Sequence, residues 1–234
     1  MRFFWCVLVL IFLVSEGVWA KTIEFATLPI PLLVESSERG LFVNLTKEIA
    51  KRSKKQIHIS VYPTGKALVA FSSHKVQVFF PGMEAFVPKK YVRSSAFYFK
   101  VDHIFFKKGR AVNSIKDLEG KKVGLTFRYV YAKELVQNKK IKFEYAADDI
   151  LNMRKLAQGQ IDAFVVEARS GLKALQLSGE KDIEFDKDAP LSEQEVFYAF
   201  HDDEEGKELA QIFTRAIDAM KKDGSLERIF KASP

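Results

Sequence analysis

Apolar residues recur along the chain with two different periods, and the two periods follow one another in a regular order. Phe42, Leu45 and Ile49 have the spacing of one helix face, whereas Ile57 to Val61 alternates as a strand does. The first third of the chain is predicted to contain strand 23–27, helix 42–53, strand 57–61, helix 65–73 and strand 76–80. This order is typical of a parallel sheet with helices on its faces.

The same order begins again near residue 114. Ser114 to Asp117 resembles a capping box, which predicts a short helix that ends at Gly120. The segments that follow are predicted as strand 123–126, helix 129–137, strand 143–145, helix 148–159 and strand 161–166. The chain is therefore predicted to contain two similar α/β units.

Two extended segments connect these units, Tyr98 to Phe106 and Glu195 to Phe200. An amphipathic helix follows the second segment up to Gly224, with a further turn or two at 225–230. Two connections mean that the chain leaves the first unit, builds the second and returns. We therefore predict one lobe from residues 21–102 together with 196–234, and a second lobe from residues 103–195.

The first twenty residues have the pattern of a targeting segment. Arg2 precedes twelve apolar residues, Phe3 to Val14, and small residues surround an expected cleavage point after Ala20. The apolar run is too short to span a bilayer as a helix. We predict a signal peptide over residues 1–20, with an uncleaved anchor as the alternative. The only cysteine and both tryptophans lie in this segment, so the mature chain has no thiol chemistry, which fits a bacterial periplasm.

Charge and the remaining residue types exclude several functions. The net charge is +7, but the basic pairs are scattered between apolar segments, so no nucleic-acid partner is expected. The four histidines are isolated, and neither a nucleophile–base constellation nor a glycine-rich phosphate loop is found. We therefore expect no metal, no cofactor and no enzymatic activity.

Four stretches carry a resemblance to a known family: Gly40 to Arg52, Gly82 to Tyr98, Ser114 to Val123 and Leu156 to Phe164. Their order and spacing resemble the family 3 periplasmic solute-binding proteins, the polar amino-acid receptors of ABC importers. The resemblance implies a two-lobed periplasmic-binding-protein fold of type II. Each lobe is then a mostly parallel sheet flanked by helices, and two hinge strands join the lobes. It also implies a monomeric periplasmic receptor that passes a small polar, amino-acid-like solute to an inner-membrane ABC permease.

The resemblance also implies ligand contacts. The arginine that holds the ligand carboxylate in the family corresponds to Lys89, and the acidic residue for the ammonium group corresponds to Glu167. Glu84 replaces a small hydroxyl residue of the family, and Arg128 and Tyr129 replace a Ser-Gly-Thr-like turn. These five residues are the candidate ligand contacts. A solvated loop for Lys89 and a hinge salt bridge for Glu167 are the alternatives.

The location of a cleft follows from elementary structure as well. Ligands of open parallel sheets bind beyond the carboxyl ends of the strands, and helix starts near those ends favour anions.

Two other functions remain open on the same fold. A dehydratase-like enzyme would use Lys89, Glu84 and Glu167 as acid and base. A ligand-sensing module would report occupancy to a membrane protein.

Overall fold

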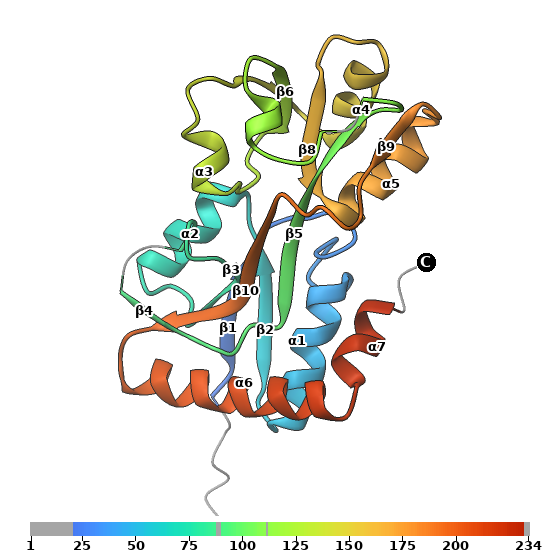
Figure 1. The fold of residues 1–234 in the computed structure, drawn as a ribbon. Coiled ribbons are helices and arrows are strands. Elements are labelled where there is room, and N and C mark those ends of the chain that lie inside the picture. Colours follow the sequence, from blue (N-terminus) through green and yellow to red (C-terminus); the bar gives the residue numbers. More distant parts are fainter. Residues whose placement is uncertain (1–20, 88–89, 111, 232–234) are drawn as a thin grey trace, which may run out of the picture.

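Strands and helices alternate through two halves of the molecule in a computed structural model that describes residues 21–87, 90–110 and 112–231 (Figure 1). The predicted signal peptide and Lys89 lie outside the described residues. The elements are β1 Ile23–Thr27, α1 Leu41–Arg52, β2 Ile57–Val61, α2 Thr64–Ser72, β3 Val78–Gly82, β4 Tyr91–Arg93, β5 Tyr98–Lys107, η1 Lys116–Leu118, β6 Lys122–Thr126, α3 Lys133–Val136, β7 Lys142–Ala146, α4 Asp149–Ala157, β8 Ala163–Glu167, α5 Ala168–Ser178, β9 Ile183–Phe185, β10 Ser192–His201, α6 Glu204–Lys222 and α7 Ser225–Lys231.

Each half is built on parallel strands. In the first half, β1 pairs in parallel with β2 and β3; in the second, β6 pairs in parallel with β7 and β8. The strand order is β2-β1-β3-β10-β5-β8-β6-β7, so the two parallel groups flank a central antiparallel pair, β10 and β5. The predicted α/β class with mostly parallel sheets is confirmed.

The long strands β5 and β10 run between the halves (Figure 1). The first part of β5 pairs with β10, Tyr98 opposite Val196, and its second part pairs with β8, Asp102 opposite Glu167. The later part of β10 pairs with β3 and β4. Each long strand therefore has one end in each half, and the extended connectors expected from the sequence are confirmed as strands.

Separate groups of buried side chains stabilise the two halves. In the first half, α6 presents Leu209, Phe213 and Ile217 to a core that contains Phe25 and Tyr198. The Phe213 ring lies 5.7 Å from that of Phe25 and 5.1 Å from that of Tyr198, as aromatic pairs in cores commonly do. In the second half, the core side chains come from β5 to β9 and the helices between them.

The predicted helix over 129–137 is wrong in extent, because only Lys133–Val136 is helical. The backbone N–H of Thr126 donates to the hydroxyl of buried Tyr131 at 2.8 Å, and this contact holds the intervening residues in a loop. Arg128 has φ 69° there, in the left-handed region. The expected helix start at Arg128 and Tyr129 is therefore absent, and a tertiary contact overrides local propensity.

Strand β3 also begins two residues later than predicted, at Val78, and extends through Gly82. Helix α5 and strands β4 and β9 were not predicted. Helix α5 starts directly after β8 without a loop, because the Glu167 side chain accepts a hydrogen bond from the N–H of Ser170 and caps the helix.

Candidate ligand-binding site

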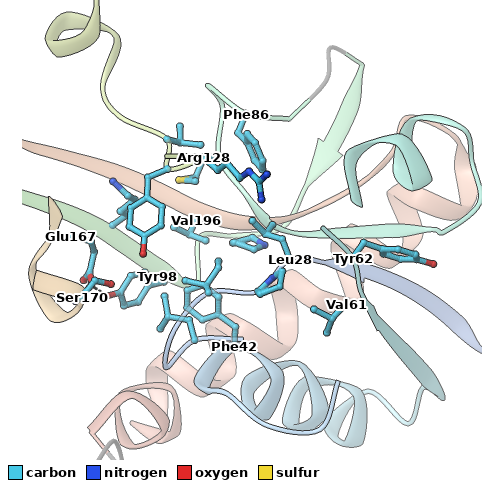
Figure 2. Close-up of a pocket in the computed structure, with 18 of the residues that line it drawn as sticks. Leu28, Phe42, Val61, Tyr62, Phe86, Tyr98, Arg128, Glu167, Ser170 and Val196 are labelled. Atoms are coloured by element: carbon cyan, nitrogen blue, oxygen red, sulfur yellow. Dashed lines mark hydrogen bonds between the residues drawn. The ribbon is translucent and has the colours of Figure 1, made fainter. Parts of the chain in front are cut away.

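A cavity of about 470 Å³ lies between the two halves, where the parallel strands of both halves end (Figure 2). Its lining comes from the loops after β1, β2 and β3 on one side and from the segments after β6 and β8 on the other, with β5 and β10 between them. The volume is in the range of small-molecule sites. The expected location beyond the carboxyl ends of the strands is confirmed.

Glu167 is the one carboxylate among the described residues that line this cavity. Its side chain is buried, and both of its oxygens have a donor. The Tyr98 hydroxyl donates to Oε1 at 2.7 Å, and the Ser170 N–H donates to Oε2 at 2.9 Å. Each oxygen can accept a further hydrogen bond, so the carboxylate is held in place while still able to meet a cationic group.

Tyr98 is held in its protonated form. Burial, followed by the neighbouring Glu167 carboxylate, raises the pKa of Tyr98 far above its ordinary value. The hydroxyl therefore remains a donor at every physiological pH. From the sequence, Tyr98 was expected only as the first residue of an extended connector. A signal for a second role is present in β5, where Tyr98, Lys100 and Asp102 alternate and so share one face.

Lys100 was not predicted as a site residue, yet it lines the cavity. Its ammonium group pairs with the carboxylate of Asp102 and lies 5.3 Å from the ring centroid of Tyr131. Asp102 also accepts a hydrogen bond from the Ser192 hydroxyl at 3.1 Å. Burial raises the pKa of Asp102, while Lys100 opposes that effect. The charge of Lys100 is therefore largely balanced by its own partner on the hinge strand.

Arg128 contributes a cation from the second half. Its side chain reaches over the cavity toward Phe86 of the first half (Figure 2), and no ion pair joins it to another described residue. The left-handed backbone conformation of Arg128 is uncommon outside glycine, and such strain is often found at functional sites.

Tyr129 also lines the cavity, but its hydroxyl has a partner in the protein. It donates to Oδ2 of Asp149 at 3.1 Å, and the Thr126 hydroxyl donates to the other oxygen of that carboxylate. Burial raises the pKa of Asp149, which has no ion-pair partner among the described residues. This small network fixes the loop that follows β6.

The structure does not bring Glu84 together with the other candidates. Its side chain is 81% exposed, and its carboxylate lies 3.8 Å from the guanidinium of Arg93. Glu84 lines a separate surface depression beside Glu193 and Glu195, outside the cavity between the halves. Met83 and Phe86, which follow β3, line the cavity instead. Glu167, Arg128 and Tyr129 do share one cavity, whereas Lys89 is outside the described residues.

The rest of the cavity lining is mostly apolar. In the first half we define the apolar wall as Leu28, Ile30, Val61, Tyr62, Met83 and Phe86, which come from the end of β2 and from the loops after β1, β2 and β3. Tyr62 is the one aromatic residue of this wall that directly follows β2. In the second half, Phe127 lines the cavity with 57% of its surface exposed.

The described part of the chain contains neither a cluster of metal-ligating side chains nor a membrane-spanning helix. No group of three or more His, Cys, Asp or Glu residues there is arranged to hold a metal ion. Within the same residues, no helix has both the length and the apolar character needed to cross a bilayer.

Two α/β halves, joined by two long strands and with a cavity between the strand ends, define a two-lobed binding-protein fold. No protein-family profile matches the chain. The chain is 26% identical over 200 residues to the arginine-binding extracellular protein ArtP of Bacillus subtilis (strain 168), covering 82% of this chain and 76% of that protein. The resemblance to solute-binding proteins noted from the sequence is confirmed over most of the chain.

Solved structures agree in fold. An ancestral arginine-binding protein bound to arginine aligns with a TM-score of 0.67 at 21% identity, covering 90% of this chain and 96% of that one. The GluR0 ligand-binding core from Nostoc punctiforme in complex with (L)-glutamate aligns with a TM-score of 0.71 at 19% identity, covering 89% and 97%. The two-lobed periplasmic-binding-protein fold is thereby confirmed.

Proposed function

We propose that this protein is an exported solute receptor that captures a small amino-acid-like solute between its lobes and passes it to an ABC permease in the inner membrane. The observation that carries the proposal is the cavity between the strand ends, which has Glu167 and Arg128 in its lining. The similarity to an extracellular binding protein supports the same conclusion.

In this proposal, opposite charges meet the two ends of a zwitterionic head group. Glu167 accepts the ammonium group, and Tyr98 and the α5 amide keep its carboxylate oriented before the solute arrives. Arg128 meets the carboxylate, because a guanidinium donates two parallel hydrogen bonds to such a group. Lys89, carried over from the family resemblance, supplies a second cation.

Capture is proposed to occur by hinge closure. The lobes are residues 21–102 with 196–234, and residues 103–195, and β5 and β10 bend between them. Closure removes water from the cavity, which strengthens each polar contact with the solute. The radius of gyration in solution is then expected to fall when the solute is added, and an unchanged radius would contradict closure.

We further propose that the protein acts as a monomer and makes or breaks no bond in the solute. Glu84, one of the three residues that an enzyme on this fold would use as acid and base, lies outside the cavity, which supports a binding role. Export is proposed to remove residues 1–20. The intact mass of the exported protein should equal that of a chain beginning at Lys21. Tryptophan fluorescence should be absent, since both tryptophans precede that residue.

The binding site is tested by a thermal-shift screen of amino acids, followed by calorimetry on variants. Glu167→Gln and Arg128→Gln should each weaken binding about tenfold to a hundredfold, because a hydrogen bond to a charged group contributes about 1.5–3 kcal/mol. Asp203→Asn is the control for the first, since Asp203 also caps a helix by accepting from the Gly206 N–H. Arg154→Gln, an exposed arginine on α4, is the control for the second. Wild-type affinity in both site variants would overturn the assignment.

A further inference from the structure

The cavity is divided along its length into a charged end and an apolar end. Glu167 and Ser170 lie at one end, beside Tyr98, and Val61 and Tyr62 lie at the other, with Leu28 between them (Figure 2). The Tyr62 side chain extends away from the other labelled residues, with its hydroxyl at the outer tip, so the hydroxyl is directed away from the charged end (Figure 2). A solute whose head group is held at Glu167 therefore extends toward carbon atoms.

In the described lining, the apolar end has no carboxylate that could neutralise a cation. Glu167, the only carboxylate in the described lining, is held at the opposite end by Tyr98 and Ser170. The other charged groups of that lining, Lys100 and Arg128, are both cations. An ionised group enclosed by apolar atoms is strongly disfavoured unless an opposite charge accompanies it. A guanidinium or ammonium side chain would therefore lose its water and gain only aromatic faces, with no opposite charge to neutralise it.

The second lobe adds an aromatic surface on the other side of the cavity. The Phe127 ring is 57% exposed and lies 5.3 Å from the Tyr145 ring, measured between centroids. A large exposed ring in a cavity lining is typical of a surface that becomes buried on binding. A flat or branched apolar group between Phe127 and the apolar wall would remove both surfaces from water.

We infer that the variable part of the solute is a large apolar group, aromatic or branched aliphatic, and that solutes with a cationic side chain are rejected. The inference rests on the proposed function, because it assigns the side-chain specificity of the same cavity. It separates this chain from the relative that is named for binding arginine, since the described lining has no second carboxylate for a guanidinium group.

Calorimetry with phenylalanine, leucine, glutamine, arginine and 3-phenylpropionate tests the inference. Phenylalanine or leucine should bind at least tenfold more tightly than arginine. Arginine or glutamine binding as tightly as both would overturn the inference while leaving the proposed function intact. Binding of 3-phenylpropionate alone would support the apolar end and overturn the zwitterionic head group. Absence of binding by every one of these compounds would overturn both proposals.

Two variants locate the specificity. Val61→Glu places a carboxylate at the apolar end and should weaken phenylalanine binding at least tenfold while improving arginine binding. Val69→Glu is the matched control, because Val69 is 66% exposed on α2 of the same lobe and does not line the cavity. Phe127→Ala should weaken phenylalanine binding about tenfold, and its exposed position makes loss of folding a poor explanation. Unchanged phenylalanine affinity in both Val61→Glu and Phe127→Ala would refute the inference.

Discussion

Helix α5 packs so closely on strands β5 and β8 that a single methyl group added to the helix should lower the unfolding free energy of the protein. Gly171 lies inside this helix, directly after the residue whose N–H donates to Glu167. A Cβ atom at Gly171 would lie 2.4 Å from Cε2 and 2.5 Å from Cζ of Phe105, and 2.6 Å from Cγ1 of Val166. Ordinary contacts between such atoms are 3.4–4 Å, so each of these atoms would have to move.

The neighbours of Gly171 have little freedom to move. Phe105 is fully buried on β5, its ring centroid lies 4.8 Å from that of Phe185, and its backbone pairs with Phe164 of β8. Inserting a methyl group into a packed core costs typically about 1–3 kcal/mol. The change from glycine to alanine in a helix gains up to about 1 kcal/mol. The Gly171→Ala variant should therefore lose about 1–2 kcal/mol of unfolding free energy.

The same substitution at Gly65 should have the opposite sign. Gly65 is also helical, in α2, and a Cβ atom there would meet no other atom within 4 Å. With no steric cost, Gly65→Ala should raise the unfolding free energy by about 0.4–1 kcal/mol. The pair therefore separates packing from helix propensity, since both variants make the same chemical change.

Urea denaturation followed by far-ultraviolet circular dichroism measures both variants, because the signal reports helix content. The midpoint should fall for Gly171→Ala and rise for Gly65→Ala, with equal slopes in the transition. A Gly171→Ala protein at least as stable as the wild type would refute the packing argument at α5. An unchanged or lower midpoint for Gly65→Ala would show that propensity is overridden there too.

Three further predictions concern buried polar groups. Thr46→Val leaves the fully buried Tyr198 hydroxyl without its 2.8 Å hydrogen-bond partner and should lower the unfolding free energy, measured by urea denaturation, by about 1–3 kcal/mol. Adding Tyr198→Phe removes the unpaired hydroxyl and should restore part of that free energy. A double variant no more stable than Thr46→Val would contradict this prediction. Burial raises the pKa of Asp149, so the folded state holds that proton more tightly, and ionisation of Asp149 destabilises the fold as pH rises above about 4. The unfolding free energy of Asp149→Asn should therefore increase relative to that of the wild type between pH 4 and pH 8. A difference between the two proteins that stays constant over this range would count against the prediction. Tyr98→Phe removes the donor to Glu167 and should lower the unfolding free energy by about 1.5–3 kcal/mol, whereas an unchanged midpoint would show that this hydrogen bond adds nothing.

Several residues of the cavity lining could be predicted because their position depends on the strand to which they belong. Glu167 follows an apolar run, Ala163 to Val166, and the end of a buried parallel strand is also the edge of the sheet. The segment after β6, with Arg128 and Tyr129, follows from the same rule. Glu84 also follows a strand end but lies outside the cavity. The end of a strand places the following loop at one edge of the sheet, whereas the direction of each side chain in that loop depends on the conformation of the turn.

The pattern of apolar residues along this chain determined most of what depends on near neighbours: the strand and helix order, its repetition, the two long connectors and the apolar face of α6. Tertiary structure alone decided what depends on distant segments. The extent of α3 follows from a contact between Thr126 and Tyr131, and the presence of Lys100 in the cavity follows from the pairing of β5 with both β8 and β10. Periodicity records only which residues are buried, whereas a cavity is formed by loops far apart in sequence, whose meeting depends on strand pairing between the lobes.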